Sequence, residues 1–358
     1  MALSTLFSGW ACINHYHSVD AHGDMHSWGE DIMVGFNKNF NYELIASKLP
    51  NAEQKFLESK SPFDLSDYAV LLMKGGKFEE ALLIFQALNK HLPNEYKLAA
   101  NLGTAYELNG ELDSALKYIN RGMELNANAH DGSEWVHIKV LETKQKLLTN
   151  PDYLAGHPVL ELTEAEKKDS AVRVQLEIQI RERFPFSPGP DAIMASLVFD
   201  LAECYSNTMS IEHAKALYQI AEQYYGYNPE LTQPKIDQMI RLRAEYKHIQ
   251  PVDDHDEGMV IKMSGVRYKE LLDDNNKSGY AINWSDFNTD TETLLSQVDY
   301  GVEFEQEQES SEVEQMAEDS AEVEETKPVK KEEGIGLWVF GIAMLLILVV
   351  LMFFRRRA

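Results

Sequence analysis

The sequence feature that most constrains the fold is an internal repeat with a period of 34 residues. It emerges when residues 65–93 are aligned with residues 99–127. The matched positions are Gly76 with Gly110, Phe78 with Leu112, Ala81 with Ala115, Phe85 with Ile119, and Pro93 with Ala127. A period of about 20 to 50 residues is typical of stacked supersecondary units, because one such unit cannot bury its apolar face alone.

Each repeat predicts two helices joined by a tight turn. Gly76 and Gly110 stand at the turns, where a glycine can adopt the positive φ that ends a helix. Small residues recur where the two helices of a pair would cross closely, at Ala69, Ala81, Gly103 and Ala115. We therefore predict two antiparallel helix pairs over residues 62–127, within an all-α fold.

These residues and their spacing resemble the tetratricopeptide repeat (TPR) family. The second copy, NLGTAYELNGELDSALKYINRGMEL, matches the family pattern at Leu102-Gly103, Tyr106, Gly110, Ala115, Gly122 and Leu125. The first copy departs from it, with Tyr68 and Ala69 where the family has Leu and Gly. The resemblance implies an α-solenoid of helical hairpins, whose first helices line a concave surface that holds an extended peptide or a partner helix.

By the register of this resemblance, six residues would line the binding groove. They are Ser66, Val70 and Met73 in the first repeat, and Lys97, Asn101 and Thr104 in the second. Asn101 stands where family members often hydrogen-bond a ligand backbone, although simple solvation on a helix surface explains an asparagine equally well. The family's Lys and Asn clamp for chaperone C-terminal carboxylates is matched only at Asn101, so that ligand is disfavoured.

The same spacing continues downstream in weaker form. A degenerate third copy over residues 201–221 keeps Leu201-Ala202, Tyr205, Ala214 and Tyr218 in place. Three further helices are predicted, over residues 133–148, over residues 163–184 with a Thr163–Glu166 capping box, and over residues 234–246 with Pro234 at the start. We accordingly expect two repeats and a capping helix in residues 62–150, and a helical region in residues 151–250.

The segments that flank these helices are less regular. Residues 12–60 predict a His-rich segment followed by a lead-in helix. Residues 251–300 have no sustained period, so we expect an irregular region there, with residues 268–272 as the candidate for a short helix. Residues 301–333 are rich in Glu and poor in aromatic residues, which predicts a disordered acidic linker.

The C-terminal end carries an apolar run, GIGLWVFGIAMLLILVVLMFF, over residues 334–354. A helix rises about 1.5 Å per residue and the hydrocarbon core is about 30 Å thick, so this run predicts one transmembrane helix. A basic tail, residues 355–358, follows. Residues 1–11 resemble the end of a secretory signal, which favours a helical domain outside the cytoplasm and a cytoplasmic tail. A tail-anchored protein with cytosolic repeats is the alternative.

Charge and motif content narrow the classes of function. The net charge of −25 argues against nucleic acid as a partner, since phosphate binding needs a positive face. No phosphate-binding, zinc-protease or nucleophile-elbow motif is present, so we expect no catalytic residues and no cofactor. The two cysteines, Cys12 and Cys204, form no CxxC motif. Cys204 is interpreted as a small core residue.

The remaining chemical candidate is the His-rich N-terminal segment. His15, His17, His22 and His26 lie close together with Cys12, and imidazole and thiolate are good ligands for Zn²⁺ or Cu²⁺. Their spacing matches no defined site, and polar loop residues are the alternative. The leading hypothesis is a membrane-anchored, non-catalytic scaffold with a protein or peptide partner. A metal-handling protein and an enzyme with an unrecognised site are the competing hypotheses.

Overall fold

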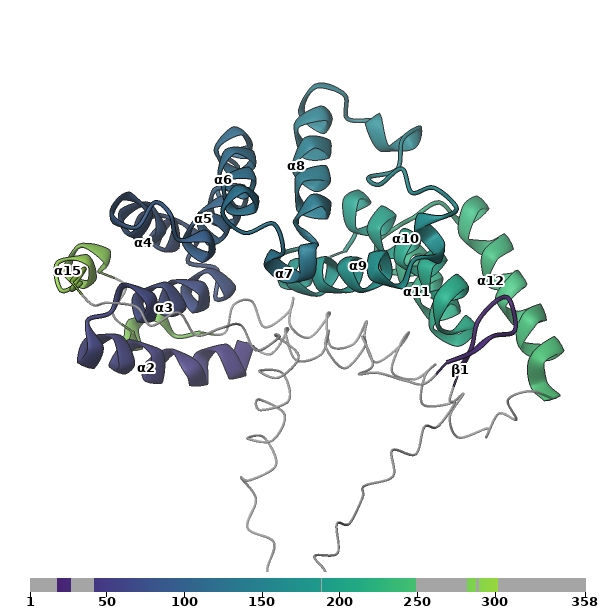
Figure 1. Ribbon diagram of the computed structural model, residues 1–358, viewed down its shortest axis with the longest axis horizontal. Helices are drawn as coiled ribbons and strands as arrows, with labels where there is room; N and C mark the ends of the chain where they lie inside the picture. Colours follow the sequence, from purple (N-terminus) through teal and green to yellow (C-terminus); the bar gives the residue numbers. More distant parts are fainter. Residues whose placement is uncertain (1–17, 27–41, 188, 249–281, 288–289, 302–358) are drawn as a thin grey trace, which may run out of the picture. The chain divides into compact units, whose positions relative to one another are not determined.

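A computed structural model describes residues 18–26, 42–187, 189–248, 282–287 and 290–301 (Figure 1). All of them belong to one compact unit within residues 1–303. The regular structure of the described residues is helical except for a pair of two-residue antiparallel strands, β1 (Ser18–Val19) and β2 (Met25–His26). The all-α expectation is therefore confirmed for this part of the chain.

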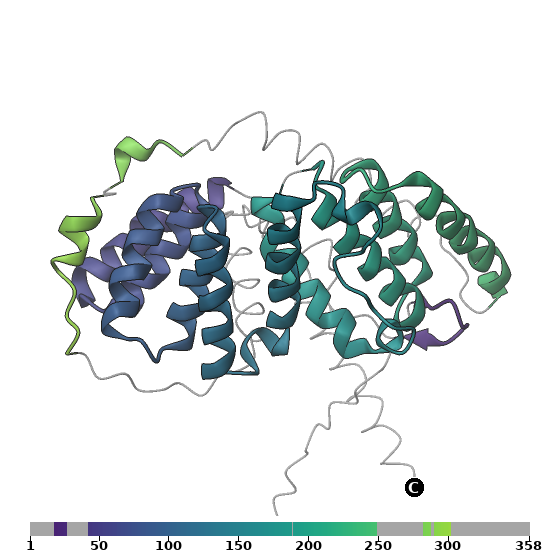
Figure 2. The same cartoon turned by 90° about the horizontal axis from the view of Figure 1, so that it is seen from above.

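Five consecutive helices form the first half of the described structure. They are α2 (Tyr42–Ser59), α3 (Pro62–Lys74), α4 (Phe78–His91), α5 (Tyr96–Leu108) and α6 (Leu112–Leu125), and each packs on the next (Figure 2). Helix α2 is the predicted lead-in helix. Helices α3 and α4 form the first predicted pair, and α5 and α6 form the second. The helix breaks fall at the expected glycines, with φ of +90° at Gly76 and +81° at Gly110.

The small residues of the repeat lie where two helices of a pair meet, as predicted. A Cβ atom on Gly103 would lie only 2.7 Å from Cδ1 of Ile119, so α5 and α6 approach each other too closely there for a side chain. Ala69, Ala81 and Ala115 are fully buried. Close packing at these positions fixes how the helices of each pair cross.

The second half contains α7 (Ala129–Gly132), α8 (Glu134–Thr149), α9 (Ser170–Arg183), α10 (Ala192–Thr208), α11 (Ile211–Gln223) and α12 (Pro229–Glu245). Four 3₁₀ turns join or follow them: η1 (Tyr153–Ala155), η2 (Glu166–Lys168), η3 (Phe184–Phe186) and η4 (Tyr246–His248). Helices α10 and α11 form the degenerate third pair. Their turn needs no glycine, because Ser210 caps α11 by accepting a hydrogen bond from the His213 amide.

Two predicted helix starts are wrong. The Thr163–Glu166 capping box forms, with the Thr163 amide donating to Glu166 at 2.7 Å, but it caps η2. Helix α9 begins only at Ser170, where Asp169 supplies the N-cap. Helix α12 begins at Pro229, after the Asn228 cap, so Pro234 lies inside the helix instead of at its start.

Apolar side chains gather in two main cores. The N-terminal core is built from α2–α5 and includes Phe56, Tyr68 and Phe85, which are fully buried. The C-terminal core is built mainly from α8–α12 and includes Phe184 and Tyr218. A small third cluster, Ala115, Ile119 and Leu141, joins α6 to α8.

Residues from near the two ends of the described structure enter these cores. Val19 of the β1–β2 hairpin is fully buried in the C-terminal core. Residues 282–301, here called the returning segment, join the N-terminal core through Ile282 and Leu294. This segment contains two short elements, η6 (Trp284–Asp286) and α15 (Thr291–Leu295), so the irregular region expected over residues 251–300 stays a prediction. Residues 249–281, with the candidate helix 268–272, lie outside the described residues.

Among the described residues, no helix is both long and apolar enough to cross a bilayer. The signal-like residues 1–11, residues 302–333 of the predicted acidic linker 301–333, and the apolar run 334–354 lie outside this part of the chain.

Candidate functional site

The six predicted groove residues lie on α3 and α5, which contact each other. Ser66 and Met73 are buried, with 6% and 4% of their surface exposed, so they offer little surface to a partner. Val70, Asn101 and Thr104 are half-buried, and Lys97 is exposed. The accessible part of the predicted groove therefore consists of these last four residues.

The polar groups of these residues differ in their availability. The Thr104 hydroxyl donates to the Ala100 carbonyl at 3.2 Å, which occupies its proton. The Lys97 ammonium lies 5.8 Å from the centroid of the Tyr96 ring. Within the described residues the Asn101 side chain makes no hydrogen bond, so its amide can both donate to and accept from a peptide backbone. Asn101 is the group best suited to hold a ligand.

A buried ionic cluster lies at the other end of α5, around Glu107. Its carboxylate accepts from His137 Nε2 at 2.7 Å, from Lys144 Nζ at 2.8 Å and from the Arg183 guanidinium at 2.9 Å. Burial raises the pKa of Glu107, but the charges of Arg183, His137 and Lys144 outweigh it and hold that pKa well below its usual value. Since the partners come from α8 and α9, the cluster joins the two halves of the structure.

Glu134 extends this cluster along α8. Its carboxylate contacts His130 Nδ1 at 2.5 Å and His137 Nδ1 at 3.4 Å. Burial raises the pKa of Glu134, but the hydrogen bonds and charges of the two histidines outweigh it and lower the pKa to about 2. Every ionisable group here is engaged with another side chain, so the cluster is suited to fixing the helices in place.

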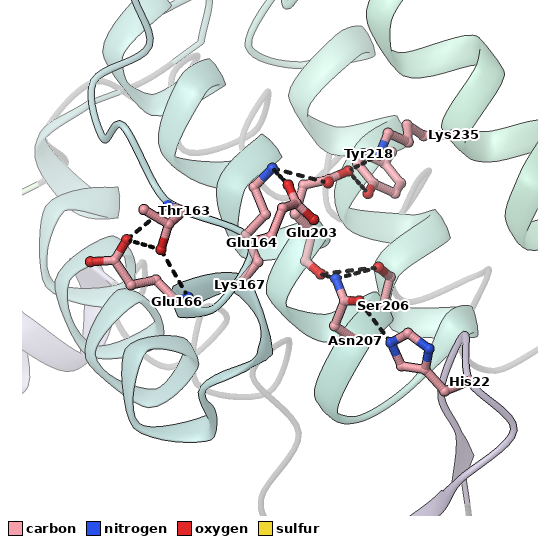
Figure 3. A network of polar contacts seen from close by, with 10 residues as sticks. All are labelled: His22, Thr163, Glu164, Glu166, Lys167, Glu203, Ser206, Asn207, Tyr218 and Lys235. Carbon is pink, nitrogen blue, oxygen red and sulfur yellow. Dashed lines mark hydrogen bonds and ion pairs between the residues drawn. The ribbon is translucent and has the colours of Figure 1, made fainter.

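A second polar network surrounds Glu203 on α10 (Figure 3). Glu203 accepts a hydrogen bond from the Tyr218 hydroxyl and forms an ion pair with Lys235 at 2.7 Å. The Lys167 ammonium lies 3.7 Å from the other oxygen of the same carboxylate. One turn earlier on the same helix, Asp200 is 6% exposed, and its Oδ2 has no hydrogen-bond partner in the described structure. Burial is the main reason that the pKa of Asp200 lies well above its usual value.

Cys204 lies on the same helix and is fully buried, as its interpretation as a core residue predicts. Burial, reinforced by the nearby Asp200 and Glu203 carboxylates, raises the pKa of its thiol to about 12. A thiol with so high a pKa is protonated at neutral pH and is a poor nucleophile or metal ligand. The residues around Glu203 therefore serve packing and charge compensation among α10, α11 and α12.

Two of the four candidate metal ligands, His22 and His26, belong to the β1–β2 hairpin. His22 Nε2 lies 3.0 Å from Asn207 Oδ1 (Figure 3), and His26 Nε2 lies 2.9 Å from Asp20 Oδ2. Cys12, His15 and His17 lie outside the described residues. Among the residues that are described, no group of three or more His, Cys, Asp or Glu is placed to hold a metal ion.

The hairpin is bound to the C-terminal half by several further contacts. The Ala21 amide donates to the Ser206 carbonyl at 2.7 Å, and the Ser18 hydroxyl donates to the Met209 carbonyl at 2.8 Å. The Tyr246 hydroxyl donates to the Ala21 carbonyl at 3.3 Å. His22 thus helps to hold the hairpin on the end of α10, whereas His26 contacts Asp20 within the hairpin.

Sequence reasoning missed the returning segment, which contacts α2–α4. Trp284 packs on Gly75, and the ring of Tyr300 stacks on His91 with 4.0 Å between ring centroids. The available signal was the presence of Trp284, Phe287 and Tyr300 in a region otherwise rich in Asp and Asn. Aromatic residues seldom remain fully solvated in a folded domain, so they indicated a docking contact without showing where it lies.

Comparison with known proteins does not extend these observations. No protein-family model matches the chain, and no curated protein matches it. Function is therefore inferred from the residues and their geometry alone.

Proposed function

We propose that this chain is a TPR-type helical scaffold that binds a protein or peptide partner on the surface formed by α3 and α5. One observation carries the proposal. Two successive helix pairs turn at Gly76 and Gly110, which occupy equivalent positions 34 residues apart and both have positive φ. Such a repeated unit presents its first helices on a shared surface, and that surface is the usual place for a ligand in helical repeat proteins.

The accessible side chains on that surface suit an extended peptide. Asn101 makes no side-chain hydrogen bond to a described residue, so its amide can hydrogen-bond a peptide backbone in both directions, and the exposed Lys97 lies one turn before it on α5. Lysine at the rim favours a partner that carries a carboxylate near the bound segment. Val70 on α3 adds a half-buried apolar contact.

The proposed scaffold is held at a membrane by residues 334–354. The support is the uncharged run of 21 residues followed directly by Arg355, Arg356 and Arg357. We propose that the helical domain lies outside the cytoplasm, because residues 1–11 resemble the end of a secretory signal; tail anchoring with cytosolic repeats is the alternative. Protease treatment of intact vesicles distinguishes the two orientations.

Site-specific crosslinking in native membranes tests the scaffold function. A photoreactive residue at position 101 should capture one defined protein, identified by mass spectrometry, while the same residue at position 120 on the exposed side of α6 should not. Lys97→Glu should lower the yield of that product at least about tenfold, as expected for loss of a favourable interfacial charge. Equal capture from positions 101 and 120, or capture unaffected by Lys97→Glu, would contradict the proposal.

A further inference from the structure

The returning segment covers a surface that is separate from the Asn101 surface. It runs beside α2–α4 (Figures 1 and 2) and reaches them after the 33 residues 249–281. Of its described residues, only Ile282 and Leu294 are buried, with 6% and 0% of their surface exposed. Its other contacts with the N-terminal core come from partly buried side chains, namely Trp284, Phe287, Leu295, Val298 and Tyr300. An extended segment that inserts apolar side chains while the rest stays exposed is held as a bound peptide is held.

The first anchor is Trp284. Its ring lies so close to Gly75, at the end of α3, that a Cβ atom on that glycine would be 2.6 Å from Trp284 Cζ2 and 3.0 Å from Ile282 Cδ1. The Lys77 ammonium lies 5.6 Å from the centroid of the indole ring, which is cation–π distance. The turn between α3 and α4 thus offers an aromatic side chain a position without a Cβ atom at Gly75 and a cation at Lys77.

Two further contacts fix the direction of the segment. The Lys60 carbonyl accepts a hydrogen bond from the Asp299 amide at 2.8 Å, and Lys60 Nζ donates to Gln297 Oε1 at 2.6 Å. The Tyr300 ring stacks on His91 at the end of α4. Backbone recognition at Lys60 combined with aromatic contacts at Gly75 and His91 is the combination that a peptide-binding site uses for affinity and specificity.

We infer that the surface marked by Lys60, Gly75, Lys77 and His91 is a peptide-binding site, which the returning segment fills within the chain and which a partner segment with an Ile-x-Trp anchor fills in its place. The inference deepens the proposed function, since both treat the helix pairs as a binding scaffold. It adds a second surface and the chemistry of its ligand, namely an extended apolar and aromatic segment. A partner can bind this second surface only when the chain's own returning segment is released from it.

Gly75 provides a sharp test because its backbone accepts a side chain. Its φ is −86°, a value that alanine adopts freely, and the atoms nearest to the added methyl group in Gly75→Ala belong to Trp284 and Ile282. Gly156→Ala is the matched control, because a Cβ atom there has no heavy atom of a described residue within 4 Å. The probe is a fluorescent peptide that spans residues 282–301.

The experiment measures binding of this peptide to the full-length chain in detergent. The Trp284→Ala chain, whose own segment has lost its aromatic contact with Gly75, should bind the peptide at least about tenfold more tightly than the wild-type chain does, the size expected for an aromatic anchor. Adding Gly75→Ala to Trp284→Ala should abolish that gain, whereas adding Gly156→Ala should preserve it. A folded Trp284→Ala chain that does not bind the peptide would overturn the inference.

A second format covers the case in which Trp284→Ala does not fold. A protease site placed within residues 249–281 allows the wild-type chain to be cut after folding, and the labelled peptide is then added in excess. Exchange of the peptide for the chain's own segment supports the inference, and absence of exchange contradicts it. If the peptide does not exchange but a residue at position 101 still captures its partner, this inference is rejected and the scaffold function stands. If the peptide exchanges but position 101 captures no partner, only the α3–α5 surface is rejected.

Discussion

Phe184 and Phe186 are two residues apart, yet their rings enter different apolar cores. Phe184 is fully buried in the C-terminal core, where it makes an edge-to-face contact with Tyr225 at 6.2 Å. Phe186 packs against the N-terminal core through an edge-to-face contact with Phe78 at 6.3 Å. The short η3 turn therefore joins the two cores, close to the point where Arg183 reaches Glu107.

We expect the two phenylalanines to contribute unequally to stability. Phe184→Ala should lower the free energy of unfolding by about 3 to 5 kcal/mol, because it leaves a cavity in a closed core. Phe186→Ala should cost less, about 1 to 2 kcal/mol, since its ring is only half-buried and loses mainly the pairing with Phe78. Chemical denaturation followed by circular dichroism measures both, and an equal cost would contradict this assignment of the rings.

The glycines of α5 and α6 offer a matched pair of substitutions. Gly103→Ala should destabilise the protein by about 1 to 3 kcal/mol, because its methyl group would lie 2.7 Å from Ile119. Gly122→Ala should instead stabilise it by up to about 1 kcal/mol, because the nearest atom, Ala100 Cβ, lies at an ordinary 3.5 Å and alanine favours a helix. Thermal unfolding measures both changes, and the same sign for both variants would reject the predicted crossing of α5 and α6.

The helix pairs could be predicted from sequence because their determinants are local and periodic. Glycines at the turns and small residues at the crossings recur every 34 residues, and each acts within its own repeat. Helix starts were harder to predict because several capping sequences compete. Asn228-Pro229 begins α12 five residues before Pro234, and Asp169 caps α9 six residues after Thr163.

The long-range contacts could not be predicted because nothing periodic marks them. Trp284 reaches Gly75, and Arg183 reaches Glu107, across long stretches of chain. A lone glutamate on an amphipathic helix is indistinguishable in sequence from a solvated one until its partners are known. Of the predicted groove, burial of Ser66 and Met73 also depends on packing that the repeat pattern does not specify.

Glu107 should make a large contribution to stability that depends on pH. Glu107→Gln leaves the Arg183 and Lys144 charges without their carboxylate, so it should cost about 3 to 5 kcal/mol at pH 7. Since the pKa of Glu107 is lowered in the folded state, this stabilisation is fully present above the unfolded-state pKa and is lost as the pH falls through the folded-state value. The difference between variant and wild type should therefore shrink below about pH 4.5, the ordinary value for glutamate.

Urea unfolding between pH 7 and pH 3 measures this difference. Glu124→Gln is the control, because Glu124 is exposed and its ion pair among the described residues is with Arg121 on the surface of α6. Its effect should stay within about 0.5 kcal/mol across the range. A Glu107→Gln cost as small as the control's would show that the ionic cluster does not hold α5 against α8 and α9.

Asp200 should show the opposite dependence on pH. Its pKa is raised in the folded state because its buried carboxyl group is more stable when neutral. The contribution of this neutral group to the free energy of unfolding is therefore fully present below the unfolded-state pKa, and it is lost as the pH rises through the folded-state pKa. Between these two values the wild-type protein should lose about 1.4 kcal/mol per pH unit through this group. Asp200→Asn removes the ionisation, so its stability relative to wild type should increase from about pH 4 upward, as measured by urea unfolding at a series of pH values.

The groups that act on Asp200 are Lys167, which favours its charged form, and Glu203, which opposes it. A constant difference between Asp200→Asn and wild type from pH 4 to pH 8 would contradict a raised pKa of Asp200 in the folded state.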